Sequence, residues 1–187
     1  MSKTVSEQVI LGIDPGTTIM GYGIVKAQGP KIQLLNYGVI HLSKYKEHAL
    51  KLKVIFERVT SLIDGYHPDC MALEAPFYGK NVQSMLKLGR AQGVAMAAGL
   101  MRELPITEYA PKEIKLAITG SGNASKEQVA GMLQNMFSIK ELPKYLDATD
   151  GLAAAVCHVH ALGNKIPQGS KKNAWGSFIK NNPERLA

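Results

Sequence analysis

The chain has 187 residues, of which 45% are hydrophobic and 20% are charged. This composition is typical of an ordinary globular protein and excludes a disordered or collagen-like chain. Lysine and arginine number 22 against 15 aspartate and glutamate residues, which gives a formal net charge of +7 at pH 7. Such an excess favours an acidic partner, and nucleic acid is the commonest one.

The ends of the chain and its cysteines indicate where the protein works. The residues before Gln8 lack the apolar core of a signal peptide, no apolar run reaches the roughly 18 residues of a membrane span, and Cys70 and Cys157 are too few for a disulfide framework. We therefore expect a cytoplasmic protein without membrane contact. We expect a flexible extension at 1–7, one domain at 8–164 and a loosely ordered basic tail at 165–187.

The hydrophobic pattern predicts three strands joined by short links, followed by alternating helices and strands. The first three strands are predicted at 8–14, 21–27 and 31–42. The later elements are predicted to be a helix at 45–65, a strand at 69–74, a helix at 81–104, a strand at 106–109, a short helix from Pro111, a helix from Ser125 to Phe137 and a helix at 147–162. Short links favour antiparallel pairing and helical links favour parallel pairing. We expect an α/β fold with a mixed five-stranded sheet and helices on both faces.

Acidic residues stand at the ends of these predicted elements. Asp14 ends the first strand and Glu74 ends the fourth, while Asp147 and Asp150 open the last helix three positions apart and so share a face. Functional sites in open α/β sheets gather beyond the carboxyl ends of the strands. If the first and fourth strands are parallel neighbours, Asp14 and Glu74 emerge side by side, and the last helix can bring its two aspartates over them.

Each acid alone fits an ordinary structural role, because Asp-Pro-Gly is a common turn, a strand can end in solvent and negative charge stabilises a helix N-terminus. Together, however, converging carboxylates repel one another unless cations join them. Oxygen-only clusters suit Mg²⁺ or Mn²⁺. Two such ions about 4 Å apart can activate a water molecule and stabilise the leaving oxygen of a phosphodiester. Residues 80–126, with seven basic side chains against three glutamates, offer a surface that could contact phosphates.

Three segments resemble the RuvC family, the crossover junction endodeoxyribonucleases or Holliday junction resolvases, which have an RNase H-like fold. The segments are DPGTTIMGYG at 14–23, LEAPFYGKN at 73–81 and DATDGLAAAVCHVH at 147–160. They stand in the order and spacing of the family, and the resemblance runs from about Val9 to Leu162. It implies paired symmetric nicks in four-way DNA junctions during recombination and repair, a homodimer, and a branch-migration complex of RuvA with RuvB as partner.

The resemblance also implies roles for particular residues. Asp14, Glu74, Asp147 and Asp150 match the catalytic carboxylates, which hold two Mg²⁺ ions per site, with Mn²⁺ as a possible substitute. The DNA-contacting positions are matched by Phe77, which would stack on a base near the junction centre, and by Lys80, Lys115 and Lys126. From the residues alone, Phe77 could be an ordinary loop aromatic and the lysines could be solvated, although Lys126 falls in the first turn of a helix, where anions bind.

Three other readings compete with a resolvase. The segment from Gly12 to Thr18 resembles the first phosphate loop of actin-like and sugar-kinase-like ATPases, but those proteins need two such domains and a second glycine-rich loop. A non-catalytic junction-binding module would be expected to lack the carboxylates. Other RNase H-like nucleases use similar acids, but the second and third motifs argue against them. Residues 120–126 lack the ending of a P-loop, so we expect no nucleotide cofactor there.

His158 and His160 stand next to Cys157 and invite a metal-site interpretation. Residues two apart on a helix do not face each other. At a rise of 1.5 Å per residue, His158 also lies roughly 12 Å along the helix from Asp150. We therefore expect structural roles for both histidines.

Overall fold

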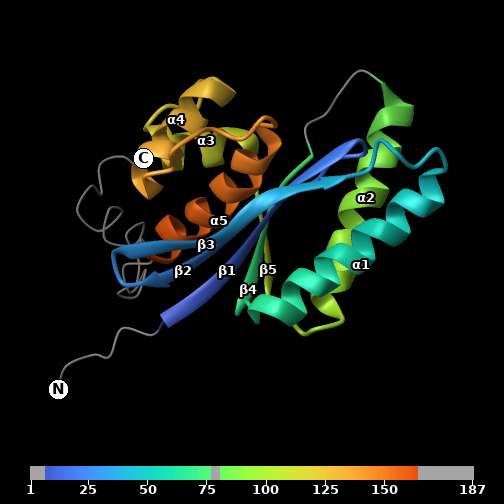
Figure 1. Cartoon of the computed structure of the whole chain (residues 1–187), viewed down its shortest axis with the longest axis horizontal. Coiled ribbons are helices and arrows are strands. Elements are labelled where there is room, and N and C mark those ends of the chain that lie inside the picture. The colour runs from blue at the N-terminus through green and yellow to red at the C-terminus, as the bar shows by residue number, and fades with distance from the viewer. Residues whose placement is uncertain (1–6, 77–80, 164–187) are drawn as a thin grey trace, which may run out of the picture.

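The computed structural model describes residues 7–76 and 81–163 (Figure 1). The predicted basic tail at 165–187, and the DNA-contacting candidates Phe77 and Lys80, lie outside the described residues. So does the predicted N-terminal extension, apart from Glu7, which begins the first strand. No helix in the described part of the chain is both long and apolar enough to cross a membrane.

One mixed sheet forms the centre of the molecule, as predicted. Its strands within the described residues are β1 (Glu7–Asp14), β2 (Ile19–Gln28), β3 (Lys31–His41), β4 (Cys70–Glu74) and β5 (Ile106–Tyr109). They lie in the order β3-β2-β1-β4-β5. The first three pair antiparallel, because short turns join them, whereas β4 pairs parallel with both β1 and β5 across helical connections.

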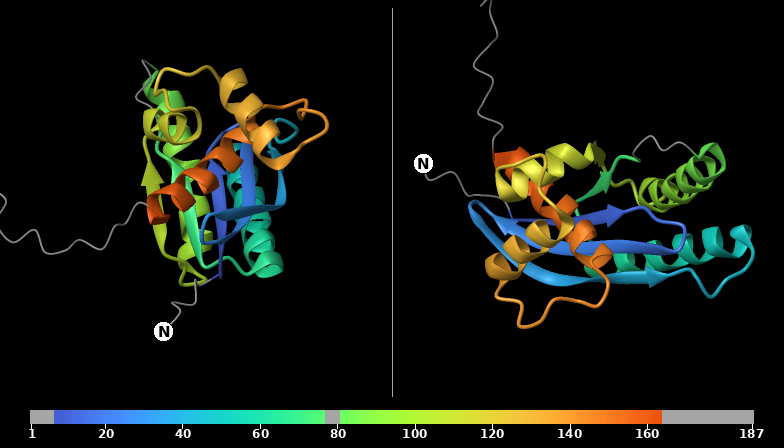
Figure 2. Two further views of the ribbon diagram at one scale, coloured as in Figure 1. Left: turned by 90° about the vertical axis from the view of Figure 1, so that its left-hand side faces the viewer. Right: turned by 90° about the horizontal axis from the view of Figure 1, so that it is seen from above.

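Helices cover both faces of this sheet, which confirms the expected layers (Figure 2). The first layer contains α1 (His48–Tyr66) and α2 (Val82–Leu100), and the second contains α3 (Pro111–Thr119), α4 (Lys126–Phe137) and α5 (Asp147–Gly163). Two separate apolar clusters fill the space between the sheet and each layer. The second predicted helix ends before residue 104, because the chain turns at Glu103, whose φ of 58° is left-handed.

Alternation along β1 sends its side chains to the two layers in turn. Leu11 and Ile13 are fully buried in the cluster under α1 and α2. Ile10 packs in the opposite cluster, under α5. Successive side chains of a strand point to opposite faces, so Asp14, four residues after Ile10, lies on the same face as Ile10. In β4, Cys70 and Ala72 also pack under α5, so Glu74 ends its strand on the same face as Asp14.

Helix α5 lies unusually close to the sheet because glycines line the contact. A Cβ atom added at Gly12 would clash with the backbone oxygen of Gly151, and one added at Gly23 would clash with the backbone of Leu152. A Cβ atom at Gly21 would meet the carbonyl of Asp147. This close approach determines how near the first turn of α5 lies to the end of β1.

Candidate active site

Three of the four predicted carboxylates meet at one point. Asp14 comes from the end of β1, and Asp147 and Asp150 come from the first turn of α5. One carboxylate oxygen from each lies within 4.8 Å of the other two. Asp150 is 8% exposed, and the other two are half-buried. The predicted convergence of distant segments is therefore present for these three side chains.

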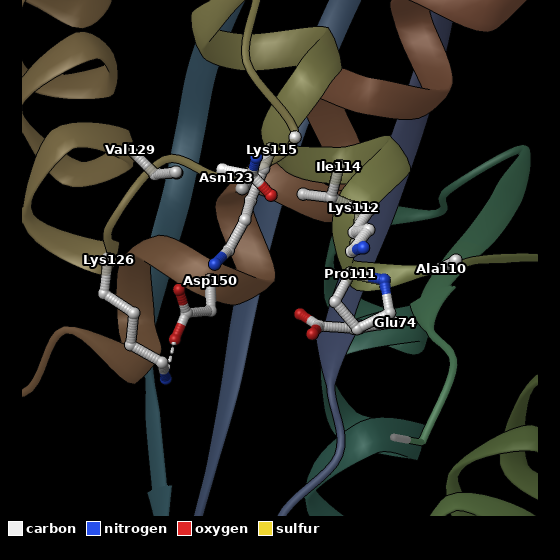
Figure 3. A pocket seen from close by; sticks show the side chains of 12 residues that line it. Glu74, Ala110, Pro111, Lys112, Ile114, Lys115, Asn123, Lys126, Val129 and Asp150 are labelled. Atoms are coloured by element: carbon white, nitrogen blue, oxygen red, sulfur yellow. Dashed lines mark hydrogen bonds and ion pairs between the residues drawn. The ribbon is translucent and has the colours of Figure 1, made fainter. Parts of the chain in front are cut away.

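Glu74 lies beside this group rather than within it. It ends β4 and, with Asp150, lines a cavity of about 600 Å³ bounded by α3 and α4. Figure 3 shows its carboxylate on the side of the cavity opposite Lys126. Glu74 is nonetheless near enough to Asp14 for its charge to raise the pKa of Asp14. The structure thus places all four acids at one end of the sheet, with three in a tight group.

The carboxylates disfavour one another's ionised forms. Burial, helped by the charges of Glu74 and Asp150, raises the pKa of Asp14 well above its usual range. Burial and the charge of Asp150 raise the pKa of Glu74 to about 7. Burial also raises the pKa of Asp150, against the opposing effect of Lys126. Added positive charge, beyond what the chain itself supplies, would favour the ionised forms of Asp14, Glu74 and Asp150.

Lys126 supplies part of that charge. Its Nζ donates to Asp150 Oδ2 at 2.5 Å. The predicted capping box holds this lysine in the first turn of α4, since Ser125 Oγ accepts from the Gln128 backbone N–H and Gln128 Oε1 accepts from the Ser125 N–H. Burial opposes the charge of Lys126, but the bond to Asp150 and the nearby acids raise its pKa overall.

Lys115 is the second predicted lysine that the structure brings to the cavity. It lies on α3 and lines the cavity wall, and Figure 3 shows it extending toward Asp150. Its charge lowers the pKa of both Glu74 and Asp150, in opposition to their burial. The cavity therefore has an acidic floor and a basic wall. The acids could hold cations, and the lysines could attract a negatively charged substrate to them.

Two polar residues of the wall were not assigned to the site from sequence. Lys112, on α3, and Asn123, in the loop before α4, both line the cavity. Lys112 belongs to the basic segment 80–126, and the positive charge of that segment could have indicated its place at the site. For Asn123 the sequence predicts only a loop, and no pattern indicates which way that loop folds.

The two histidines of α5 have polar contacts away from the carboxylates. His158 Nδ1 lies 2.8 Å from the hydroxyl of Tyr109 on β5. His160 Nδ1 lies 3.0 Å from the carbonyl oxygen of Ala117 on α3. These contacts join α5 to its neighbours, in keeping with the structural roles expected for both.

The donor set indicates which cation the site would hold. Asp14, Asp147 and Asp150 offer only carboxylate oxygens, which hard divalent cations prefer over the nitrogen and sulfur ligands typical of zinc. Burial and the neighbouring carboxylates raise the pKa of Asp14 and Asp150, and a bound cation would favour their ionised forms. The residues therefore fit a metal ion bound by oxygen ligands.

Comparisons with known proteins agree with this chemistry. The family model described as crossover junction endodeoxyribonuclease RuvC matches residues 10–158. The protein of that name from Christiangramia forsetii is 64% identical over 181 residues, covering 97% of this chain and 94% of its own length. The one from Bacteroides fragilis is 57% identical over 188 residues, covering 100% of both.

A solved structure extends the agreement to three dimensions. T. thermophilus RuvC in complex with Holliday junction substrate matches with a TM-score of 0.78 at 31% identity, covering 83% of this chain and 95% of that chain. The match confirms the expected RNase H-like fold. The chain belongs to the RuvC family of crossover junction endodeoxyribonucleases.

Proposed function

We propose that this chain is a metal-dependent endonuclease that resolves four-way DNA junctions by paired symmetric nicks in recombination and repair. Membership of the RuvC family supports the reaction and the substrate. The observation that carries the proposal is the meeting of Asp14, Asp147 and Asp150 within 4.8 Å, next to a cavity with a basic wall. A nuclease needs both, because it must hold cations and a polyanion in one place.

The four carboxylates would hold the cations, with Mg²⁺ as the metal, two ions per site and Mn²⁺ as a substitute. When bound, such ions lower the pKa of water and stabilise the charge that develops on a phosphodiester during hydrolysis. Asp14, Asp147 and Asp150 form the tight ligand group, and Glu74 faces it from the end of β4. Lys115 and Lys126 stand on the opposite wall, where they can contact the phosphate and position the cleaved strand.

A homodimer is part of the proposal, since two equivalent sites related by a two-fold axis match a two-fold junction. Helix α2 supports this, because it carries large apolar side chains that are exposed in the described part of the chain. These are Val82 at 69%, Leu86 at 50% and Leu100 at 61%, followed by Met101 at 66%. Burying that stripe against a second copy would remove apolar surface from water.

The remaining parts of the proposal rest on the family resemblance and the sequence. Phe77 and Lys80 would contact the DNA near the junction centre, and RuvA with RuvB would deliver the junction. The chain would act in the cytoplasm, with residues 8–164 as the nuclease domain and residues 165–187 as a basic tail.

The competing functions have less support. An actin-like or sugar-kinase-like ATPase is disfavoured by the family match over residues 10–158, which is to an endodeoxyribonuclease. A non-catalytic junction-binding module gives no reason for Asp14, Asp147 and Asp150 to be grouped, with the pKa of Asp14 raised by burial and by neighbouring charges.

The test is cleavage of a synthetic four-way junction with and without Mg²⁺. We expect symmetric nicks that require the metal, and an Asp14→Asn variant that binds the junction but does not cut it. A linear duplex of the same sequence is the control substrate. Strong cleavage by Asp14→Asn, or equal cutting of the duplex, would contradict the proposal.

A further inference from the structure

A small polar cavity is lined in part by Thr17, which stands in the loop that follows β1 and Asp14. Its volume is about 220 Å³, and it is enclosed by the start of α1, the start of α2 and the link between β1 and β2. Figure 1 shows these three segments at the same end of the molecule. We call it the basic pocket, and it is lined by Thr17, Lys46, His48, Lys51, Ser84 and Lys87.

In the described part of the chain, no carboxylate lines this pocket to match its positive charge. Within the described residues, no acidic side chain forms an ion pair with Lys46, Lys51 or Lys87. Lys51 Nζ donates to the carbonyl oxygen of Thr17 at 2.9 Å, which fixes the lysine against the loop after β1. Gathering three cations in a small space is unfavourable unless an anion joins them.

His48 gives an independent indication that a partner is missing. Its Nε2 is shielded from solvent and has no hydrogen-bond partner among the residues that the structure describes. Burial, together with the charges of Arg90, Lys87 and Lys51, lowers the pKa of His48. A buried ring nitrogen left without a partner is costly, and an anion in the pocket would both accept its hydrogen bond and offset the surrounding cations.

The backbone of α1 adds donors to the same place. Glu47 is the N-cap of α1 but makes no side-chain cap, and the first turn contains no acidic residue. The first N–H groups of a helix lack partners within it and carry a partial positive charge. The first turn of α1, which includes His48 and Lys51, therefore combines free donors with basic side chains.

We infer that the basic pocket binds a phosphate of the DNA backbone, a second anchoring point on the strand that enters the carboxylate site. This inference rests on the proposed function, because the DNA is the junction. Asp14 and Thr17 are three residues apart, so their Cα atoms lie at most about 11 Å from each other. Nucleotides of one strand advance about 3.4 Å along a duplex, so the bound phosphate lies a few nucleotides from the cut.

Such an anchor would position the DNA strand and would take no part in the hydrolysis itself. A phosphate held beside α1 and α2 fixes the direction in which the strand leaves the cavity between α3 and α4. Two contacts on one strand, on either side of the end of β1, define its path better than one.

The first experiment measures binding of a fluorescent four-way junction by anisotropy, in EDTA so that nothing is cut, over a series of salt concentrations. The pocket variant is Lys46→Gln/Lys87→Gln. The control is Lys53→Gln, which removes a lysine of α1 that is 69% exposed, paired with Glu57 and outside the pocket. A charge-conserving variant, Lys46→Arg/Lys87→Arg, tests whether charge is what matters.

One phosphate contact contributes about 0.9 to the slope of log affinity against log salt. We therefore expect the pocket variant to lose about one unit of slope, with binding roughly five- to tenfold weaker near 0.1 M salt. The control should stay within about twofold of the wild type, and the arginine variant should retain most of the affinity. A pocket variant that matches the control would overturn the inference.

Junctions with a single neutral methylphosphonate then locate the phosphate. Replacing the contacted phosphate should weaken binding by the wild type but not by the pocket variant, at one position within a few nucleotides of the cut. If the losses of the two proteins are equal at every position, the lysines act as a general field and not as an anchor.

A DNA-free measurement separates this inference from the proposed function. The histidine proton signals of the wild type are followed by NMR while millimolar inorganic phosphate is added. We expect the His48 signal to shift in the wild type and to shift much less in the pocket variant. If this occurs but the wild type neither binds nor cuts junctions, the proposed function fails and the anion site stands. If junction cleavage is normal but no signal responds and the salt slopes agree, the inference alone fails.

Discussion

Lys126 Nζ lies 2.5 Å from Asp150 Oδ2, so the first turn of α4 delivers a cation to a nearly buried carboxylate on α5. The two residues are 24 positions apart in the chain. Lys126 thus occupies Asp150 Oδ2. A cation held by Asp150 would have to bind the other oxygen beside this positive charge or displace the lysine.

Removing this lysine should lower the stability of the protein and raise its affinity for Mg²⁺. In Lys126→Gln, Asp150 loses its partner, so we expect the free energy of unfolding in EDTA to fall by about 1 kcal/mol, a modest value because the lysine is half exposed. Mg²⁺ should bind severalfold more tightly, because the positive charge of the ammonium group is no longer next to Asp150. Urea unfolding and the rise in Tm with Mg²⁺ measure the two effects.

Lys112→Gln is the control for that comparison. Lys112 lines the same cavity but forms no ion pair in the described part of the chain. It should leave both quantities nearly unchanged. Weaker Mg²⁺ binding by Lys126→Gln would show that the lysine supports the cation instead of competing with it.

The ionisation of Glu74 should appear in the pH dependence of stability. Burial and Asp150 raise its pKa in the folded protein from 4.5 to about 7. Because the folded pKa is above the unfolded one, the ionised group opposes folding. The cost is absent below about pH 4.5 and complete above about pH 7.

Glu74→Gln removes this cost. We expect the variant to be about 1–3 kcal/mol more stable than the wild type at pH 8 in EDTA, and no more stable at pH 4. The measurement is urea unfolding at both pH values, with the exposed Glu57→Gln as a control that should show no such trend. A constant difference at the two pH values would mean that ionisation is not its cause.

The glycine contact between β1 and α5 should be essential to the site. Gly12→Ala places a methyl group against the backbone of Gly151. We expect a loss of about 3 kcal/mol in the free energy of unfolding, together with loss of nicking, since α5 must move away and carry Asp147 and Asp150 with it. Gly131→Ala in α4, where an added Cβ meets nothing within 4 Å, should instead stabilise by about 0.5–1 kcal/mol.

The contact between Tyr109 and His158 should be structural. Tyr109→Phe removes a hydroxyl that lies 2.8 Å from His158 Nδ1. We expect a loss of about 1 kcal/mol in stability, measured by thermal or urea unfolding. The Mg²⁺ dependence of Tm should not change, and a changed dependence would argue that His158 contributes to the metal site.

Much of the fold could be predicted because local and long-range signals agree. Short turns and helical links determine which strands pair antiparallel and which pair parallel, so the ends of β1 and β4 could be placed together. The capping box at Ser125 and Gln128 predicted the start of α4, and therefore the neighbourhood of Lys126.

Other features depend on distances that no periodic pattern encodes. Glu74 was expected to join the acidic group, but its separation from Asp147 depends on how far α5 sits above β4. The partner of Lys126 could not be identified, because it lies on another helix. The basic pocket was also not foreseen, since His48, Lys51 and Lys87 come from two helices whose relative placement the sequence leaves open.

The alternation of β1 has a consequence for how this chain can change. Adding or deleting a single residue between Ile10 and Asp14 would exchange the two faces, turning Asp14 toward Met20 and Leu73 in the apolar cluster beneath α1 and α2. Both the carboxylate site and the packing of the core would be lost. We therefore expect this strand to tolerate neither insertions nor deletions. The hairpin at Gly29 and Pro30, remote from the acids, can vary in length without that penalty.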